Sequence, residues 1–456
     1  MIQPFENQYV LCRRERSIGY INKNILTAVV AKENGDIFEL EGYGAAGMSN
    51  NQPCVLKKKE TLVMPRGGEL MMLPGRKPIV FNILNNQFQV IERNPYHPDE
   101  TIYPVAVFNS PGFVNRFYCA YSDEHSNDFL PLFSYGAVGF GRNNFRSAAI
   151  LVDKEPRQDL RQMPHKNVLK GVNRLKKKYP GNRLVKHLET CARQYGCPAG
   201  KNFFLQRYEA PLPASKTCNA RCLGCISLQT GSNLCACQER IKFTPTPTEI
   251  AEVALEHITH VKKAIVSFGQ GCEGDPLTAF NVILPAIQLI REKTDKGTIN
   301  LNTNASLPLR VADLSRAGLD GMRVSMNSVR DAYYNAYFRP KNYPFSDVKK
   351  SIQTAKANGV FVAINYLNCP GFSDGQKEAS ALMDFIDTFG IDMIQWRNLN
   401  FDPRKYCRLM SGIGDHDEAM GMSNLIDAVS KAFPTLIHGY FNPPKENYEK
   451  HPGSCR

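Results

Sequence analysis

Three cysteines lie close together in "KTCNARCLGCISLQ", residues 216–229. Cys218, Cys222 and Cys225 are separated first by three residues and then by two. Three thiolates on one short loop can hold three irons of a [4Fe–4S] cluster. The fourth iron then has no protein ligand and is open to a small molecule. Gly224 permits the tight turn between the last two thiols.

Zinc and disulfide chemistry are the alternatives for this loop. Structural zinc needs a fourth ligand, which Cys235 or Cys237 in "NLCACQER" could supply. Zinc sites usually pair two C-x₂₋₄-C units, however, and a C-x-C unit fits that pattern poorly. A disulfide would leave one of the three thiols unpaired. The spacing therefore favours the open iron–sulfur cluster and leaves zinc as the alternative.

The cysteine loop follows the first of a series of alternating strands and helices. Such alternation predicts a parallel sheet with right-handed crossovers, and six units suggest a partial (β/α)₆ barrel rather than the closed eightfold TIM barrel. Functional groups of such sheets gather at the C-terminal ends of the strands, where the cysteine loop falls. The six expected strands are residues 203–211, 263–269, 298–304, 321–328, 360–368 and 391–399.

Four segments follow from these patterns. Residues 1–153 read as a β-rich domain with hairpin turns such as "ENGD", and no constellation there indicates its role. Residues 154–202 form a basic connector with helical periodicity. Residues 203–440 form the barrel, and residues 441–456 form a C-terminal tail. The fold class is therefore α/β, with a β-rich domain before the barrel.

Composition and charge narrow the class of protein. The chain has 456 residues, of which 43% are hydrophobic and 22% charged, as in an ordinary globular protein. It has no apolar run long enough for a membrane span and no secretory signal at its start, so we expect a cytoplasmic protein without a membrane partner. The other eleven of its 14 cysteines are scattered, mostly in apolar stretches.

The formal net charge of +13 is concentrated in one place. Residues 154–193 hold 12 Lys and Arg against 3 Asp and Glu. Such a run is usually a solvated helix face. It could also dock an acidic partner, such as RNA, an acidic peptide or an electron-donating protein.

Polar motifs follow the later strands of the barrel. "GCEGDPL" (271–277) comes after the second strand and "NTNAS" (302–306) after the third. With the cysteine loop after the first strand, this arrangement resembles the radical S-adenosylmethionine (radical SAM) superfamily over about residues 203–440. The resemblance implies a [4Fe–4S] cluster on the three cysteines and S-adenosylmethionine at its open iron.

The resemblance also implies which residues bind the cofactor. The second glycine, the acid and the proline of the family's Gly-Gly-Glu-Pro motif match Gly274, Asp275 and Pro276. This loop offers backbone carbonyls and an acceptor to the methionyl amine. The remaining implied positions are Thr303 and Asn304 near the cofactor, Ser325 and Asn327 towards ribose and carboxylate, and Arg397 as a partner for a carboxylate.

Two positions depart from the family pattern. The family usually has an aromatic residue just before the third cysteine, where this chain has Gly224. The acid of the motif is Asp275, one methylene shorter than Glu. Both departures concern the contacts of the bound cofactor rather than the cluster itself.

The implied reaction begins with an electron from a donor such as flavodoxin or ferredoxin. The reduced cluster cleaves S-adenosylmethionine, and the 5′-deoxyadenosyl radical removes hydrogen from a substrate. A peptide, protein or nucleic acid is favoured as substrate, with the β-rich domain as its holder, and the basic connector leaves an acidic macromolecule open as that substrate. The sequence identifies no catalytic residue towards the substrate.

Two further possibilities remain open at this point. Cys191, Cys197, Cys235, Cys237 and Cys272 could hold a second cluster, although none has convincing ligand spacing, so one cluster is predicted. The alternative function is a non-enzymatic protein that binds zinc and nucleic acid, in which the basic connector would make the contacts.

Overall fold

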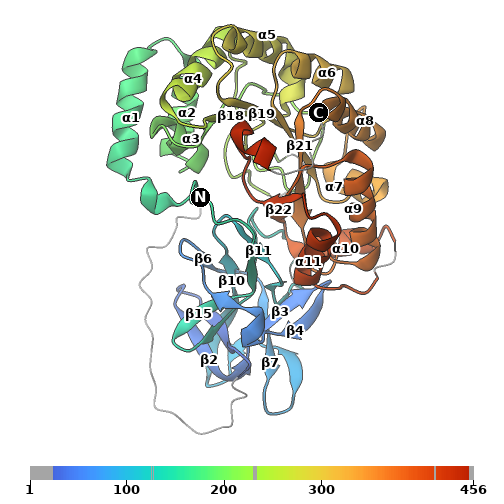
Figure 1. Cartoon of the computed structure of the whole chain (residues 1–456). Coiled ribbons are helices and arrows are strands. Elements are labelled where there is room, and N and C mark those ends of the chain that lie inside the picture. Colours follow the sequence, from blue (N-terminus) through green and yellow to red (C-terminus); the bar gives the residue numbers. More distant parts are fainter. Residues whose placement is uncertain (1–23, 125, 127, 230–233, 415–416, 451–456) are drawn as a thin grey trace.

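The structure is a computed structural model that describes residues 24–124, 126, 128–229, 234–414 and 417–450. Figure 1 shows two lobes. The smaller lobe consists of strands from the N-terminal third of the chain. The larger lobe contains parallel strands with helices around them, and it carries the cysteine loop.

The larger lobe is a half-barrel of parallel strands with helices on its outer face (Figure 1). Neighbouring strands in the sheet are also consecutive in the sequence of the lobe. The partial parallel barrel predicted from the sequence is confirmed. In sheet order the seven strands are β17 (Glu209–Pro211), β18 (Ile265–Phe268), β19 (Thr298–Thr303), β20 (Gly321–Met326), β21 (Phe361–Asn368), β22 (Met393–Asn398) and β23 (Ile437–Gly439).

Capping explains where the first of the outer helices, α4, begins. Thr246 accepts a hydrogen bond from the Glu249 backbone N–H, and Glu249 accepts one from the Thr246 N–H, so two free donors of the first turn are satisfied.

No helix in the described ranges combines the length and apolar character that a membrane span requires. The outer helices are α4 (Pro247–His260), α5 (Phe280–Arg291), α6 (Pro308–Arg316), α7 (Asp331–Phe338), α8 (Phe345–Ala357), α9 (Gln376–Phe389), α10 (Pro403–Ser411) and α11 (Met422–Ala432).

Two features of the half-barrel differ from the sequence-based expectation. The first strand was expected from Phe203, but Phe203 and Phe204 end helix α3 (Pro198–Phe204). Pro198 begins that helix at a position where proline needs no N–H partner. Strand β23 adds a seventh strand that the sequence analysis missed, because three residues are too few to show a strand pattern.

The smaller lobe is antiparallel β structure, as expected for a β-rich N-terminal domain. Its small apolar clusters lie between its strands, while Met48, Val114 and Tyr118 join the core of the larger lobe. Its strands are β1 (Thr27–Lys32), β2 (Ile37–Gly44), β3 (Ala46–Ser49), β4 (Gln52–Val55), β5 (Leu62–Val63), β6 (Glu69–Met72), β7 (Lys77–Asn82), β8 (Gln87–Val90), β9 (Arg93–Asn94), β10 (His97–Phe108), β11 (Phe113–Asn115), β12 (Tyr118–Cys119), β13 (Tyr121–Ser122), β14 (Val138–Gly141), β15 (Asn144–Ser147) and β16 (Ala149–Leu151).

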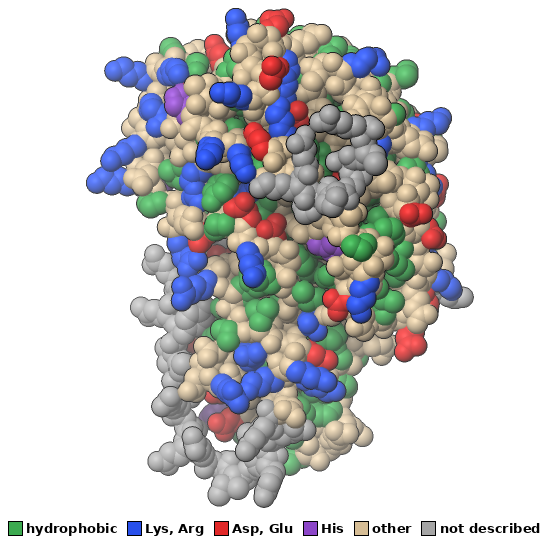
Figure 2. All heavy atoms as spheres, in the orientation of Figure 1, with side chains coloured by type: hydrophobic (Ala, Val, Ile, Leu, Met, Phe, Trp, Pro, Cys, Tyr) green, Lys and Arg blue, Asp and Glu red, His purple; other side chains and the backbone are tan. Residues whose placement is uncertain are grey.

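The basic connector folds into α1 (His165–Lys178), α2 (Arg183–Arg193) and α3, which pack beside α4. Several of its positive charges have acidic partners. On the face drawn in Figure 2, Lys and Arg side chains are spread over both lobes rather than gathered on the connector. The ion pairs of the connector helices are Lys176–Glu189, Lys178–Glu256, Arg183–Glu249 and Arg193–Glu189.

The smaller lobe contacts the half-barrel at the C-terminal ends of its strands. Asn398, the last residue of β22, accepts a hydrogen bond from the Asn115 N–H at 2.8 Å and donates to the Phe113 carbonyl at 2.9 Å. Just beyond β22, the Tyr121 hydroxyl donates to Asp402 at 2.8 Å. The N-terminal lobe therefore covers part of the barrel edge where functional groups of this fold gather.

Candidate active site

The cysteine loop begins directly after β17, at the C-terminal edge of the half-barrel. Its backbone is fixed by neighbouring elements. The Leu223 N–H donates to the Tyr337 carbonyl of α7 at 3.0 Å, and the Gly224 carbonyl accepts from the Asn400 side chain, which follows β22, at 2.9 Å. The loop is thus attached to the segments that follow β20 and β22.

The three thiols are free and partly buried. Burial raises the pKa of Cys218 to about 11 and that of Cys222 well above its ordinary value, and nearby charges add to both effects. Arg240 donates to the Cys225 sulfur at 3.6 Å. The thiolate is the form of cysteine that ligates metal.

The spacing of these sulfurs tests the choice between a cluster and a single zinc ion. Tetrahedral zinc with bonds of about 2.3 Å holds its sulfurs about 3.8 Å apart. Across the described ranges, only one group of three His, Cys, Asp or Glu side chains brings its ligand atoms within 4.8 Å of one another, and it is not this trio. The wider spacing suits a cluster, whose irons occupy different corners of a cube.

Tyr337 occupies the space beside Gly224. A Cβ atom at position 224 would lie 2.4 Å from the Tyr337 hydroxyl and 2.9 Å from the Asn400 side-chain oxygen. The residue before the third cysteine must therefore be small here. An aromatic ring is still present beside the loop, but it comes from α7 and the sequence analysis did not identify it.

The loop after β18 packs tightly against the cysteine loop at Gly274. The Gly274 N–H donates to the Ser215 carbonyl at 2.7 Å. A Cβ atom at Gly274 would lie 1.8 Å from the Thr217 carbonyl oxygen, a backbone atom that cannot turn away. Only glycine permits this approach of the two loops.

Asp275 links this loop to the end of β19. Its carboxylate accepts hydrogen bonds from the Thr303 hydroxyl, the Asn304 N–H at 2.7 Å and the Leu277 N–H at 3.0 Å. Burial raises its pKa to about 6. Pro276 follows it and begins the short 3₁₀ helix η3 (Pro276–Ala279). The carboxylate is thus engaged by protein donors, and its role towards a methionyl amine stays a prediction.

Glu273 is a buried acid that the sequence analysis did not identify. Its carboxylate accepts four backbone N–H donors, two from Ala214 and Ser215 after β17 and two from Gly269 and Gln270 after β18. Burial raises its pKa to about 7, although these donors favour the ionised form. Glu273 therefore sets the geometry of both strand ends. Its position one residue before Gly274 was the available signal.

Asn304 completes the contact between the three loops. Its side chain donates to the Asn219 side-chain oxygen of the cysteine loop at 2.8 Å, and Asn219 donates to Ser306 at 2.8 Å. The predicted positions Gly274, Asp275, Pro276, Thr303 and Asn304 are therefore brought together beside the cysteines.

The predicted residues on the later strands line the inside of the half-barrel. Ser325 on β20 and Arg397 on β22 are only partly buried, whereas their strand neighbours Val324 and Trp396 are fully buried against the helices. Since side chains alternate along a strand, the first pair faces the interior. Asn327 is fully buried and donates to the Tyr406 hydroxyl at 3.0 Å.

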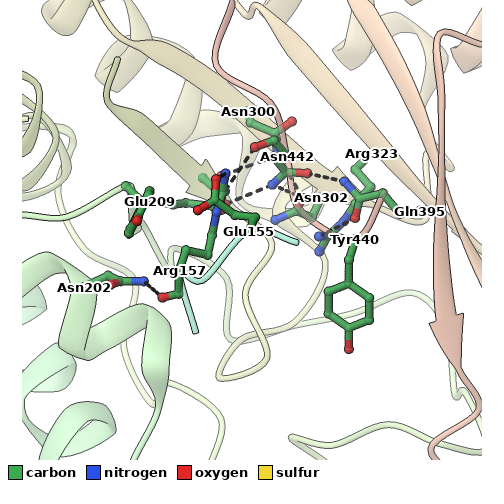
Figure 3. A network of polar contacts seen from close by, with 12 residues as sticks. Glu155, Arg157, Asn202, Glu209, Asn300, Asn302, Arg323, Gln395, Tyr440 and Asn442 are labelled. Atoms are coloured by element: carbon green, nitrogen blue, oxygen red, sulfur yellow. Dashed lines mark hydrogen bonds and ion pairs between the residues drawn. The ribbon is translucent and has the colours of Figure 1, made fainter. Parts of the chain in front are cut away.

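A buried polar network crosses the interior (Figure 3). Arg157 forms an ion pair with Glu209 at 3.0 Å, and Asn442 donates to Glu209 at 2.9 Å. Burial alone would raise the pKa of Glu209, but the Arg157 guanidinium and other donors hold it below its ordinary value. The network continues from Asn442 to Gln395 at 2.9 Å.

Two guanidiniums meet at Gln395. Arg323 and Arg397 donate to the same Gln395 side-chain oxygen, at 3.2 and 3.4 Å. Burial and the nearby Arg397 lower the pKa of Arg323 to about 9. Within the described ranges neither forms an ion pair, and the Nε atoms of both are buried without a hydrogen-bond partner. Glu209, whose charge acts on Arg323, is itself paired with Arg157, so positive charge is in excess here and the two Nε donors are free.

The residues present fit the cofactors that the resemblance implied. Three partly buried thiols lie on one loop at the barrel edge, and the half-barrel contains buried polar atoms without partners, among them the Asn327 and Asn365 side-chain oxygens. Cys235 and Cys237, which could have completed a zinc site, are both exposed, and Cys237 donates to the Leu132 carbonyl of the smaller lobe.

Residues 212–383 match the family model of the radical SAM superfamily. The members of that superfamily use a [4Fe–4S] cluster and S-adenosylmethionine. The matched segment contains the three cysteines, the loop after β18 and the strands from β18 to β21.

Three solved structures are among those to which this chain is similar. SuiB from Streptococcus suis bound to precursor peptide SuiA is 12% identical, with a TM-score of 0.35, and the match covers 55% of this chain and 50% of that one. SuiB bound to S-adenosylmethionine is 14% identical, with a TM-score of 0.38 and coverage of 70% and 72%. Methylornithine synthase (PylB) is 15% identical, with a TM-score of 0.36 and coverage of 54% and 69%.

The match therefore spans half the length of the peptide-bound SuiB chain, and the likeness concerns the fold alone. A search of curated proteins found no match. The family model, the half-barrel and the cysteine loop at its edge agree with one another. Residues 212–383 of this chain therefore form a radical SAM domain.

Proposed function

We propose that this chain is a radical SAM enzyme in which Cys218, Cys222 and Cys225 hold the [4Fe–4S] cluster. The observation that supports this most strongly is the placement of the three thiols. They lie on a loop that is joined to the Gly274–Asp275 loop at the C-terminal edge of the half-barrel. When bound, the cluster supplies the electron that cleaves S-adenosylmethionine to a radical, which then removes a hydrogen atom from the substrate.

The chain's own residues position this chemistry. Gly274 lets the two loops approach, and Asp275 and Glu273 fix their backbones through buried hydrogen bonds. Loops whose backbones are fixed in this way bind a ligand without rearrangement. The N-terminal lobe, which lies against the end of β22, helps to exclude water from the reactive species.

The interior of the half-barrel favours a substrate with an anionic group. Arg323 and Arg397 carry two positive charges close together, and Glu209, the acid whose charge acts on Arg323, is already paired with Arg157. Planar guanidiniums bind carboxylates and phosphates through paired hydrogen bonds. A carboxylate or phosphate would relieve the repulsion between the two arginines. Peptides and proteins carry carboxylates and nucleic acids carry phosphates, so each substrate class favoured by the sequence supplies one of these groups.

Anaerobic reconstitution with iron and sulfide tests the activity. With S-adenosylmethionine and a strong reductant, the chain should release 5′-deoxyadenosine and show the brown absorption of an iron–sulfur cluster. A colourless protein that holds zinc at the cysteine loop and releases no 5′-deoxyadenosine would instead support the non-enzymatic alternative.

Mass spectrometry of cells with and without the gene tests the substrate. Peptides, RNA and metabolites should be compared for a mass shift that requires Cys222. A modified species bearing a carboxylate or phosphate should disappear in cells with Cys222→Ala and decline with Arg397→Gln. A neutral product whose level is unchanged by Arg397→Gln would overturn the anionic-substrate proposal but leave the radical chemistry intact.

A further inference from the structure

A second group of metal-binding side chains lies outside the cysteine loop. His187 and Cys191 occupy positions i and i+4 of α2, so they project one turn apart from the same helix face. Cys272, in the loop after β18, reaches the same point from a distant part of the sequence. The ligand atoms of these three residues all lie within 4.8 Å of one another.

The group is enclosed by the fold. Cys191 is 1% exposed and Cys272 is 4% exposed, and both thiols are free. The His187 Nε2 atom lies 3.6 Å from the Cys191 sulfur. The Phe243 ring packs edge-on against the imidazole, with ring centroids 6.3 Å apart. A cysteine that served only as a small apolar side chain would not require an imidazole nitrogen at its sulfur.

The spacing and the donor types are those of a single zinc ion. Zinc binds Cys sulfur at about 2.3 Å and His nitrogen at about 2.0 Å, so tetrahedral ligands lie about 3.5 to 3.8 Å apart. The 3.6 Å between His187 and Cys191 falls in that range. Two thiolates balance the charge of Zn²⁺, so the buried site carries no net charge.

We propose that His187, Cys191 and Cys272 bind one zinc ion that attaches α2 to the loop after β18. A water molecule fills the fourth position, because the group within 4.8 Å supplies three protein ligands among the described residues. The site is structural. It holds the loop that also contains Glu273 and Gly274, and it does not depend on the proposed radical chemistry.

Zinc analysis of a variant without the cluster thiols tests the proposal. Full-length chain with Cys218, Cys222 and Cys225 all replaced by Ala is purified without added metal and washed with a chelator. Elemental analysis should find about one zinc per chain. Adding Cys191→Ser, Cys272→Ser or His187→Ala should reduce zinc to background.

Matched controls are Cys235→Ser and His260→Ala, which replace exposed residues of the same types and should leave the zinc content unchanged. A variant of a buried residue can fail to fold. The metal-free chain that lacks only the three cluster thiols is therefore also titrated with Co²⁺. Absorption of tetrahedral cobalt with thiolate charge transfer should saturate at one equivalent.

Three results would overturn the proposal. The first is the absence of both zinc and the cobalt spectrum. The second is iron bound to the chain that is lost with Cys191→Ser. The third is a Cys191–Cys272 disulfide in freshly purified protein whose thiols have been trapped with a thiol reagent. The second result would mean that these residues ligate an auxiliary cluster.

Discussion

The two cysteine groups of this chain are assembled in opposite ways. Cys218, Cys222 and Cys225 are neighbours in sequence, yet their sulfurs do not all lie within 4.8 Å. His187, Cys191 and Cys272 come from two distant segments, and their ligand atoms do. Sequence proximity allows a loop to wrap a large cluster, whereas a single ion needs side chains that the fold brings to one point. The difference predicts different metals for the two groups.

Loss of a cluster thiol should have the largest effect. Cys222→Ala, Cys218→Ala or Cys225→Ala should each lower 5′-deoxyadenosine formation by more than about 100-fold, because two thiolates cannot hold the cluster with one iron open. Cys191→Ser, in the same assay, should retain measurable activity. Chromatography of the reaction products measures both. A wild-type rate of 5′-deoxyadenosine formation in a cluster-thiol variant would contradict the assignment of the cluster. Complete loss of this activity in Cys191→Ser alone would contradict the separate role of the second group.

Gly274, which lies between the two groups, should tolerate no side chain. In Gly274→Ala the new methyl would meet the Thr217 carbonyl at 1.8 Å, so the two loops must separate. Overpacking of this kind costs about 1–3 kcal/mol or more. We expect the Kd for S-adenosylmethionine, measured calorimetrically on reconstituted protein, to rise at least about tenfold.

Gly181→Ala is the matched control, because a Cβ at that exposed turn meets no atom within 4 Å. Its free energy of unfolding should change by no more than about 0.5 kcal/mol. Equal affinities in the two variants would show that the close approach at Gly274 does not position the cofactor.

Glu273→Gln should weaken the framework shared by both groups. The amide offers one acceptor oxygen where the carboxylate offers two, so some of the four backbone N–H donors lose their partner and face an NH₂ group. We expect the free energy of unfolding to fall by about 2 kcal/mol. Urea denaturation measures it. Glu239→Gln, at a surface pair with Lys242, is the control and should be nearly neutral.

A smaller, pH-dependent effect should come from the start of α2. Glu249 accepts hydrogen bonds from the Arg183 side chain and backbone, and these contacts lower its pKa to about 2. The folded-state pKa is below the ordinary value of 4.5, so its contribution to stability is present above pH 4.5 and is lost as the pH falls towards 2.

Since the pair lies near the surface, this contribution is at most about 1 kcal/mol. Urea midpoints between pH 6 and pH 3 should decline less steeply in Glu249→Gln than in the parent chain. Identical slopes would mean that the Arg183–Glu249 contact does not stabilise the helix that carries His187 and Cys191.

Much of the fold could be predicted because its signals are local. The alternation of apolar strands and amphipathic helices predicted the half-barrel. Three closely spaced cysteines predicted the cluster loop. The β23 strand was too short to recognise, and Phe203 was assigned to a strand although Pro198 starts a helix there.

The site was less accessible to sequence reasoning where it depends on contacts across the fold. Tyr337 beside Gly224, and Arg323 beside Arg397, meet only in the folded chain. The second group left a partial signal, because His187 and Cys191 have the i, i+4 spacing of ligands on a helix. Cys272 could be joined to them only in space. The roles of Ser325, Asn327 and Arg397 towards the cofactor stay predictions.

The most direct test of the central claim is the metal content of the full-length chain after anaerobic reconstitution. We predict about four irons and one zinc per chain, with the iron lost in Cys222→Ala and the zinc lost in Cys191→Ser. About eight irons without zinc would contradict the assignment of the second group, and zinc without iron would contradict the assignment of the first.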